Sequence, residues 1–312
     1  MKTIAIVALV GIAAVAFLSF SSAPSSSVET QFRDFLDTYR VGYGNSDEYS
    51  YRLSVFEDNL KTIAELNRKN PLATFAVNKF ADRTKQEMKA LRGLSVTPKQ
   101  RSVAAVEIAD SKDADWTGFW GKVKDQGQCG SCWAFSATAA FEARYHISQG
   151  KSSVETYFAE QQLVDCDPQS EGCNGGLMDY AFQYLETHKF CNENDYKYTA
   201  RDGKCKDSKC TDGPTVKGHT DLPNEAAVLK ELVNGPVAVA VDAENWSFYS
   251  GGIFTDCGTD LDHGVTLVKS NSVEDSVTIR NSWGSGWGEN GHIRLAKGNT
   301  CGYASDASIP NF

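Results

Sequence analysis

Nine cysteines constrain this chain more than any other feature, because all of them lie at or beyond Cys129. The residues before Cys129 contain no cysteine. In an oxidising compartment eight of nine cysteines can pair, and one thiol is left over. The distribution therefore predicts a thiol-free N-terminal part, a cross-linked C-terminal part and one free thiol that needs an explanation of its own.

The N-terminus predicts the compartment. Met1-Lys2 is followed by an uncharged apolar run from Thr3 to Phe20 and then by the small residues Ser21-Ser22-Ala23. This order is typical of a signal peptide, which we place at residues 1–23. The alternative is an uncleaved membrane anchor, since the run approaches spanning length. No basic stop-transfer cluster follows it, which favours cleavage and entry into the secretory pathway, with no membrane association afterwards.

Charge divides the chain where the cysteines do. Residues 23–109 contain 13 Lys and Arg against 11 Asp and Glu, a net charge of +2. Residues 110–312 contain 17 against 29, a net charge of −12. Opposite signs predict that the two parts attract each other. The acidic balance of the larger part argues against nucleic acid as a partner.

The apolar pattern changes from helical to strand-like along the chain. Helical spacing occurs within residues 32–39 and 53–66, and Asp82 is a candidate cap for a third helix that reaches Arg92. Residues 93–112 have the composition of an exposed linker. Further helices are expected from Ser131 and within 160–165, 176–186 and 224–233, then strands within 237–241, 264–268, 277–280 and 292–296. Helices followed by strands predict an α+β enzyme of two lobes with a cleft between them.

Cys132 is the strongest candidate for a reactive residue. It closes a Cys129-Gly-Ser-Cys132 segment, which fits a redox dithiol, half of a zinc site, or a structural cysteine beside a nucleophile. The redox interpretation lacks a thioredoxin-like context. The zinc interpretation lacks a second ligand pair, because the spacing from Cys166 to Cys173 is unsuitable. A thiolate in the first turn of a buried helix faces the positive end of the helix dipole, which lowers its pKa.

Two residues far downstream complete a nucleophilic constellation. His263 lies 131 residues after Cys132, directly before a predicted strand, and Asn281 lies 149 residues after it. An imidazole can hold a thiolate as an ion pair, and an Asn carbonyl can accept the second imidazole proton and fix the ring. The other histidines lack such a context and are expected to be structural or exposed: His146, His188, His219 and His292.

Around these residues the sequence resembles the papain family, specifically its cathepsin L-like cysteine proteases. The matching segments are Gln126-Gly-Gln-Cys129-Gly-Ser-Cys132-Trp133 and Asn281-Ser-Trp283. The resemblance implies a papain-like fold, with a helical left lobe and a β-barrel-like right lobe. It also implies that Gln126 supplies a side-chain donor to the oxyanion hole and that Trp283 shields the Asn281–His263 hydrogen bond.

The N-terminal part is similar to the helical inhibitory propeptide of the same proteases. Ala76-x-Asn78-x-Phe80-x-Asp82 is similar to the second propeptide motif, with Ala76 where glycine is usual. A generic amphipathic helix would not explain the polar members of the first motif, which comprises Glu48, Arg52, Val55, Phe56, Asn59, Ile63 and Asn67. The resemblance implies a propeptide at residues 24–109, which blocks the cleft of a peptidase domain at 110–312 until acid weakens the contact.

The family's disulfide frame implies three bridges, Cys129–Cys173, Cys166–Cys205 and Cys257–Cys301, and leaves Cys132 free. Cys191 and Cys210 are additional to that frame. We expect a fourth bridge between them, the alternative being two buried free thiols.

The substrate-binding residues implied by the resemblance surround the pocket for the second residue before the scissile bond. Leu177 and Met178 are expected to form its apolar wall, and Gly176 is expected to pair with the substrate backbone. Asp306 falls at its bottom, where relatives usually have a small neutral residue. We expect Asp306 to admit Arg or Lys there, unless its short side chain turns to solvent. The complete expected set is Gly175, Gly176, Leu177, Met178, Asp262, Trp283 and Asp306.

The sequence therefore predicts a monomeric cysteine endopeptidase made as a zymogen, which hydrolyses proteins and peptides without a cofactor or metal. No His-rich insertion that would block the cleft is present, which favours an endopeptidase over a dipeptidyl exopeptidase. One rival is a non-catalytic relative, against which the intact Cys132, His263, Asn281 and Gln126 argue. The other is an inhibitor built on the propeptide fold, which would not need two hundred further residues. A lysosome-like vacuole and the extracellular space are both compatible compartments.

Overall fold

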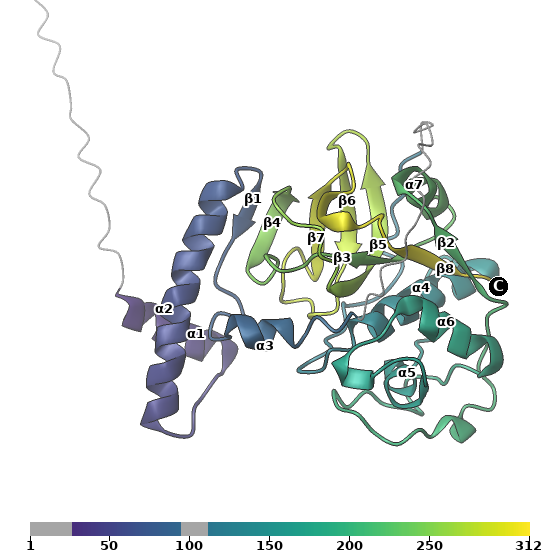
Figure 1. Ribbon diagram of the computed structural model, residues 1–312, viewed down its shortest axis with the longest axis horizontal. Coiled ribbons are helices and arrows are strands. Elements are labelled where there is room, and N and C mark those ends of the chain that lie inside the picture. Colours follow the sequence, from purple (N-terminus) through teal and green to yellow (C-terminus); the bar gives the residue numbers. More distant parts are fainter. Residues whose placement is uncertain (1–26, 95–111) are drawn as a thin grey trace, which may run out of the picture.

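The structure is a computed structural model that describes residues 27–94 and 112–312. The predicted signal peptide and most of the predicted linker lie outside these residues. We call residues 27–94 the prosegment. Figure 1 shows the prosegment against one edge of a large sheet, and helices α4, α5 and α6 on the other side of the molecule. No helix within the described ranges is long and apolar enough to cross a membrane.

The prosegment is helical because capping residues begin each of its helices. It contains α1 (Val28–Tyr39), α2 (Ser46–Lys69), β1 (Ala73–Phe75) and α3 (Lys85–Lys89). The side chains of Ser27, Asn45 and Thr84 each accept a hydrogen bond from a backbone N–H of the first turn. These contacts satisfy donors that a helix N-terminus would otherwise leave unpaired.

A small aromatic core joins the first two helices of the prosegment. The Phe56 ring on α2 lies 5.2 Å from Phe32 and 5.4 Å from Phe35, both on α1. An ion pair then ties α2 to α3, with Arg52 Nη1 2.8 Å from Glu87 Oε2. The packing of α1, α2 and α3 on one another therefore relies on this aromatic cluster and on this ion pair.

The helical lobe consists of α4 (Cys132–Ser148), α5 (Glu160–Cys166) and α6 (Met178–Thr187), with short 3-10 turns at Gly172–Asn174 and Asp207–Lys209. Helix α4 is buried nearly all round, with Trp133, Ala137 and Phe141 fully covered. A helix without a polar face belongs in the centre of a domain, and α4 packs against both α6 and the sheet. It therefore lies between the two lobes.

The second lobe is built on an eight-stranded sheet that also includes β1 of the prosegment. Its other strands are β2 (His219–Leu222), β3 (Val237–Val241), β4 (Tyr249–Phe254), β5 (His263–Asn271), β6 (Ser276–Arg280), β7 (His292–Ala296) and β8 (Ala307–Pro310). Helix α7 (Glu225–Leu232) and a 3-10 turn at Thr300–Gly302 accompany them. The strand order is β1-β4-β7-β6-β5-β3-β8-β2. The strands form the expected β-rich lobe, but within the described residues the sheet does not close into a barrel, and β1 and β2 are its two edges.

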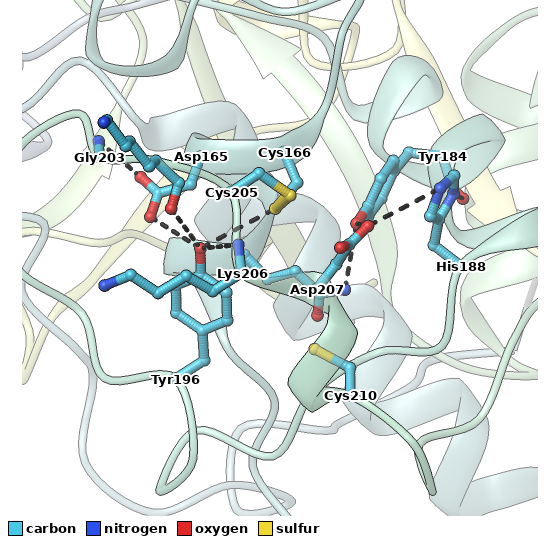
Figure 2. Close-up of a disulfide and its surroundings, with 12 residues drawn as sticks. Asp165, Cys166, Tyr184, His188, Tyr196, Gly203, Cys205, Lys206, Asp207 and Cys210 are labelled. Atoms are coloured by element: carbon cyan, nitrogen blue, oxygen red, sulfur yellow. Dashed lines mark hydrogen bonds and ion pairs between the residues drawn. A yellow bond between two sulfur atoms is a disulfide. The ribbon is translucent and has the colours of Figure 1, made fainter.

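Four disulfides cross-link the part of the chain that follows Cys129. They are Cys129–Cys173, Cys166–Cys205, Cys257–Cys301 and Cys191–Cys210, and they leave Cys132 free. Figure 2 shows the surroundings of Cys166–Cys205, where the Tyr196 hydroxyl lies 3.9 Å from Cys166 Sγ and donates to Asp165. Cys129–Cys173 fastens the loop before α4 to the loop that carries Gly175 and Gly176.

Local details differ from the sequence-based expectation at the end of the prosegment. Thr84, not Asp82, caps α3, because Thr84 and Glu87 form a reciprocal capping box. Asp82 is buried and accepts a hydrogen bond from Tyr43. The helix ends at Lys89 rather than at Arg92, so the chain leaves helical geometry before it reaches the cleft.

Candidate active site

The free thiol of Cys132 begins helix α4. Ser131 is the N-cap, and Cys132 is the first helical residue, at the positive end of the helix dipole. The Cys132 side chain is fully buried, and its sulfur accepts the backbone N–H of Gly264 at 3.4 Å. The first residues of β5 therefore lie directly beside the thiol.

His263 and Asn281 meet because two neighbouring strands are antiparallel. His263 begins β5, Asn281 directly follows β6, and the register pairs Thr266 with Arg280. The start of one strand and the end of the other thus lie at the same end of the sheet. His263 Nε2 donates to Asn281 Oδ1 at 2.8 Å. This bond fixes the ring and assigns the proton to Nε2, so Nδ1 is the nitrogen left to accept a proton.

The His263–Asn281 pair is enclosed by aromatic rings. The Trp283 ring centroid lies 4.9 Å from that of His263, and Trp246 approaches the same imidazole edge-on at 6.3 Å. His263 is fully buried and Asn281 is 4% exposed. Water therefore has little access to the hydrogen bond between them.

Gln126 is held in one orientation next to the thiol. It is fully buried, and its Oε1 accepts a hydrogen bond from Ser282 Oγ at 2.6 Å. Its Nε2 donates to the carbonyls of Cys129 and Leu91, both at 2.8 Å. Leu91 belongs to the prosegment, so a prosegment carbonyl occupies the side-chain donor expected to serve an oxyanion.

The prosegment crosses the thiol at Gly93. The Gly93 carbonyl accepts from the Gly176 N–H at 3.1 Å, and Leu94 forms a parallel bridge with Gly176. A Cβ on Gly93 would lie 1.9 Å from the Gly130 carbonyl oxygen, so no larger residue fits this crossing. Gly93 and Leu94 were expected to begin an exposed linker. That expectation is wrong, because these two residues cover the site.

The remaining sequence-predicted residues lie around this crossing. Leu177 and Met178 are buried, and Leu94 packs against the apolar cluster that contains Met178. Gly175 adopts a φ of 137°, which favours glycine. The backbone carbonyl of Asp262 accepts the Leu94 N–H at 3.3 Å. Asp306 is half-buried and lines an adjoining pocket with Leu261 and Asp262.

Burial beneath the prosegment decides the charge state of the pair. Loss of solvent raises the pKa of Cys132 to about 11, although backbone N–H groups of Gly264 and Gly93 oppose the rise. Burial also lowers the pKa of His263 to about 3, against the effect of the hydrogen bond that it donates to Asn281. Desolvation disfavours each charged form and outweighs the helix dipole here. The covered site therefore holds a neutral thiol and a neutral imidazole at neutral pH.

Sequence reasoning missed several residues that build this site. Ser282 holds the Gln126 amide, and its only sequence signal is its position between Asn281 and Trp283. Leu91 and Arg92 contact the cleft although no motif includes them. Trp246 covers the imidazole from a turn between β3 and β4.

Two protein-family models match the chain. Residues 108–311 match the family model described as papain family cysteine protease. Residues 32–88 match the cathepsin propeptide inhibitor domain (I29).

The relatives span nearly the whole chain. Thiol protease SEN102 of Hemerocallis is 39% identical over 295 residues, which cover 85% of this chain and 81% of the relative. Cathepsin L 2 of Paramecium tetraurelia is 37% identical over 307 residues, with 94% and 96% covered.

Solved precursor structures share the fold. Digestive procathepsin L 3 of Tenebrio molitor larval midgut matches with a TM-score of 0.79 and 36% identity, over 92% of this chain and 100% of that one. A recombinant stem bromelain precursor matches with a TM-score of 0.81 and 31% identity, over 91% and 99%. The chain belongs to the papain family of cysteine proteases and carries a cathepsin-type propeptide inhibitor domain.

Proposed function

We propose that the chain is the zymogen of a cathepsin L-like endopeptidase in which Cys132 is the nucleophile, His263 the proton carrier and Asn281 the residue that orients the ring. One observation carries the proposal. A free thiol at a helix N-terminus accepts the backbone N–H of Gly264, the residue next to His263, and the Nε2 of His263 is already bonded to Asn281. This is the arrangement that thiol-based acyl transfer requires.

The proposed reaction has two halves. Cys132 Sγ attacks the scissile carbonyl carbon, and the thiol proton passes to His263 Nδ1. His263 then protonates the leaving amine as the C–N bond breaks, which leaves a thioester on Cys132. Water, deprotonated by His263, attacks the thioester and regenerates the thiol.

The developing oxyanion needs donors that are already in place. Gln126 Nε2 and the Cys132 backbone N–H are the proposed pair. Removal of one such donor typically costs about 3 kcal/mol of transition-state stabilisation. The Ser282 hydroxyl contributes by holding the Gln126 amide in the donating orientation.

The subsites are proposed from the residues that the prosegment now covers. Leu177 and Met178 form an apolar wall for the second residue before the scissile bond, and Gly175 and Gly176 contact the substrate backbone. Leu94 packs against the apolar cluster that contains Met178, which supports an apolar preference. Asp306, which lines the adjoining pocket with Leu261 and Asp262, is proposed to admit Arg or Lys at this subsite as well. If Phe-Arg dipeptidyl substrates are cleaved but Arg-Arg substrates are not, at either neutral or mildly acidic pH, Asp306 does not admit basic residues at this subsite.

Activation is proposed to follow the loss of the whole propeptide, roughly residues 24–109, at acidic pH in a lysosome-like vacuole or outside the cell. Disulfides and relatives named cathepsin L indicate the secretory route. The mature enzyme, residues 110–312, is proposed to act as a monomer on proteins and peptides.

The decisive experiment is acid incubation of the purified precursor. We expect a shift to lower mass together with peptidase activity that requires a thiol reductant. Cys132→Ala should abolish this activity and leave the circular dichroism of the precursor unchanged. An active Cys132→Ala protein, or a processed wild type without activity, would contradict the proposal.

A further inference from the structure

A pocket of about 650 Å³ adjoins the prosegment crossing, on the side of Arg92. The enzyme contributes Asp242, Glu244, Asp260 and Asp262 to its lining, and Asp306, already proposed for the neighbouring subsite before the scissile bond, lines it as well. Two cations also line it, Lys89 and Arg92, and both belong to the prosegment. Among the described lining residues, none of those from the enzyme is a cation, so loss of the prosegment leaves an acidic pocket.

The Arg92 side chain is seated in this pocket as a ligand would be. Its Nε lies 2.6 Å from Asp262 Oδ2, and the side chain is only 7% exposed. The other oxygen, Asp262 Oδ1, accepts the backbone N–H of Ala243 at 2.9 Å. One oxygen thus holds the carboxylate in place while the other faces the cation, so the geometry does not depend on Arg92.

The enzyme backbone also fixes the remaining wall. Asp242 Oδ1 accepts the N–H of Glu244, and Asp242 Oδ2 accepts the N–H of Asp260, each at 3.1 Å. Asp242 is 5% exposed, so it serves as the anchor of these two loops. Glu244 and Asp260 are consequently held at the pocket by the fold of the enzyme itself.

The position of Arg92 along the cleft identifies the substrate residue that the pocket would take. Leu94 pairs with Gly176, where the residues before the scissile bond are proposed to bind, and Gly93 crosses the thiol. Arg92 precedes Gly93 in the chain, on the side of the crossing opposite Leu94 and Gly176. It therefore lies on the side of the thiol where the leaving amine departs.

We propose that the mature enzyme binds the Lys or Arg side chain of a substrate in this pocket, at the first residue after the scissile bond, with Asp262 as its main contact. This proposal rests on the proposed endopeptidase function. The guanidinium of a substrate would replace that of Arg92, and a charge-assisted hydrogen bond would select it over an uncharged side chain of equal size.

The test compares internally quenched peptides that differ only at that residue, which is Arg, citrulline or Leu. Citrulline keeps the shape of Arg without its charge. We expect kcat/KM for Arg to exceed that for citrulline about tenfold, as one charge-assisted bond in a partly exposed site allows. The ratio should fall below about twofold in Asp262→Asn and should shrink as salt screens the pocket.

Two controls make the outcome specific. Glu186→Gln removes the same charge from an exposed site on α6, outside the pocket, and should leave the ratio unchanged. A dipeptidyl aminocoumarin substrate ends at the scissile bond and has no side chain for the pocket. It therefore reports any damage that Asp262→Asn does to the neighbouring His263.

The possible results separate this proposal from the one it rests on. If Cys132 does not support cleavage of the aminocoumarin substrate, the proposed function fails. If it does, and Arg and citrulline peptides are cleaved equally well, the pocket proposal is overturned. If Asp262→Asn loses all activity, the Arg-to-citrulline ratio of kcat/KM is measured in Glu244→Gln and Asp260→Asn instead. A ratio unchanged in both variants would overturn the proposal.

Discussion

The prosegment and the enzyme are stabilised by different physics. The prosegment has no cysteine, and its helices depend on an aromatic cluster, capping side chains and the Arg52–Glu87 ion pair. The enzyme has four disulfides, and its apolar core continues into the prosegment, whose Phe32, Phe56 and Phe75 belong to the same cluster as residues of the sheet. The covalent cross-links are therefore confined to the enzyme, and its fold does not depend on the prosegment for them.

Removal of the aromatic core of the prosegment should give the largest effect. Phe56→Ala leaves a cavity between α1 and α2. The cavity should lower the free energy of unfolding of the prosegment by about 3 kcal/mol. A loss of about 3 kcal/mol lowers the equilibrium constant for the closed, prosegment-covered state roughly a hundredfold. We expect the precursor to cleave a fluorogenic peptide at neutral pH without acid treatment.

The matched control for Phe56→Ala is Tyr51→Ala on the same helix, because the Tyr51 side chain is 53% exposed. Its truncation should leave the precursor inactive at neutral pH. Equal activity from both variants would mean that the aromatic cluster does not hold the prosegment in place.

Removal of the bridge that is additional to the family frame should weaken only the enzyme. Cys191 and Cys210 are 19 residues apart, and closing such a loop contributes about 3 kcal/mol through the unfolded chain. We expect the mature Cys191→Ala, Cys210→Ala double variant to unfold at a temperature lower by about 5–10 °C in calorimetry. Hydrogen exchange of α1 and α2 in the precursor should stay unchanged, and faster exchange there would show that the two regions are not independent.

Acid should act on the prosegment through Glu87. The hydrogen bond from Arg52 lowers the Glu87 pKa to about 2 from its ordinary 4.5, although burial opposes the shift. A depressed carboxyl pKa stabilises the fold above pH 4.5, and this stability is lost as the pH falls from 4.5 toward 2. The contribution is about 2 kcal/mol after allowance for the partly exposed site.

Glu87→Gln in a Cys132→Ala background should therefore speed hydrogen exchange of α3 at pH 7 and remove much of its acceleration at low pH. Glu65→Gln is the control, since Glu65 forms an exposed pair with Lys69. If acid speeds hydrogen exchange of α3 equally in the Glu87→Gln variant and in the protein with Glu87, the acid-sensitive contact lies elsewhere.

Much of the site could be predicted because its signals are local in sequence. The residues around Cys132 specify a buried helix with a thiol in its first turn, and helical periodicity predicts α1 and α2, although the periodic segments begin after both helices have begun. The short strands β2, β4 and β8 were not predicted, because each is stabilised by partners far along the chain. Thr84 replaced Asp82 as the cap of α3, since both residue types cap helices and only the backbone position selects between them.

The sequence by itself determined which residues we propose for the chemistry: a free thiol among paired cysteines, a distant histidine and an asparagine. Tertiary structure alone decided their state. It brought Gly93 over Cys132, turned Gln126 toward the Leu91 carbonyl and seated Arg92 against Asp262. The physical reason is that charge state and occupancy depend on solvent exclusion, and exclusion comes from segments that are adjacent in space and remote in sequence.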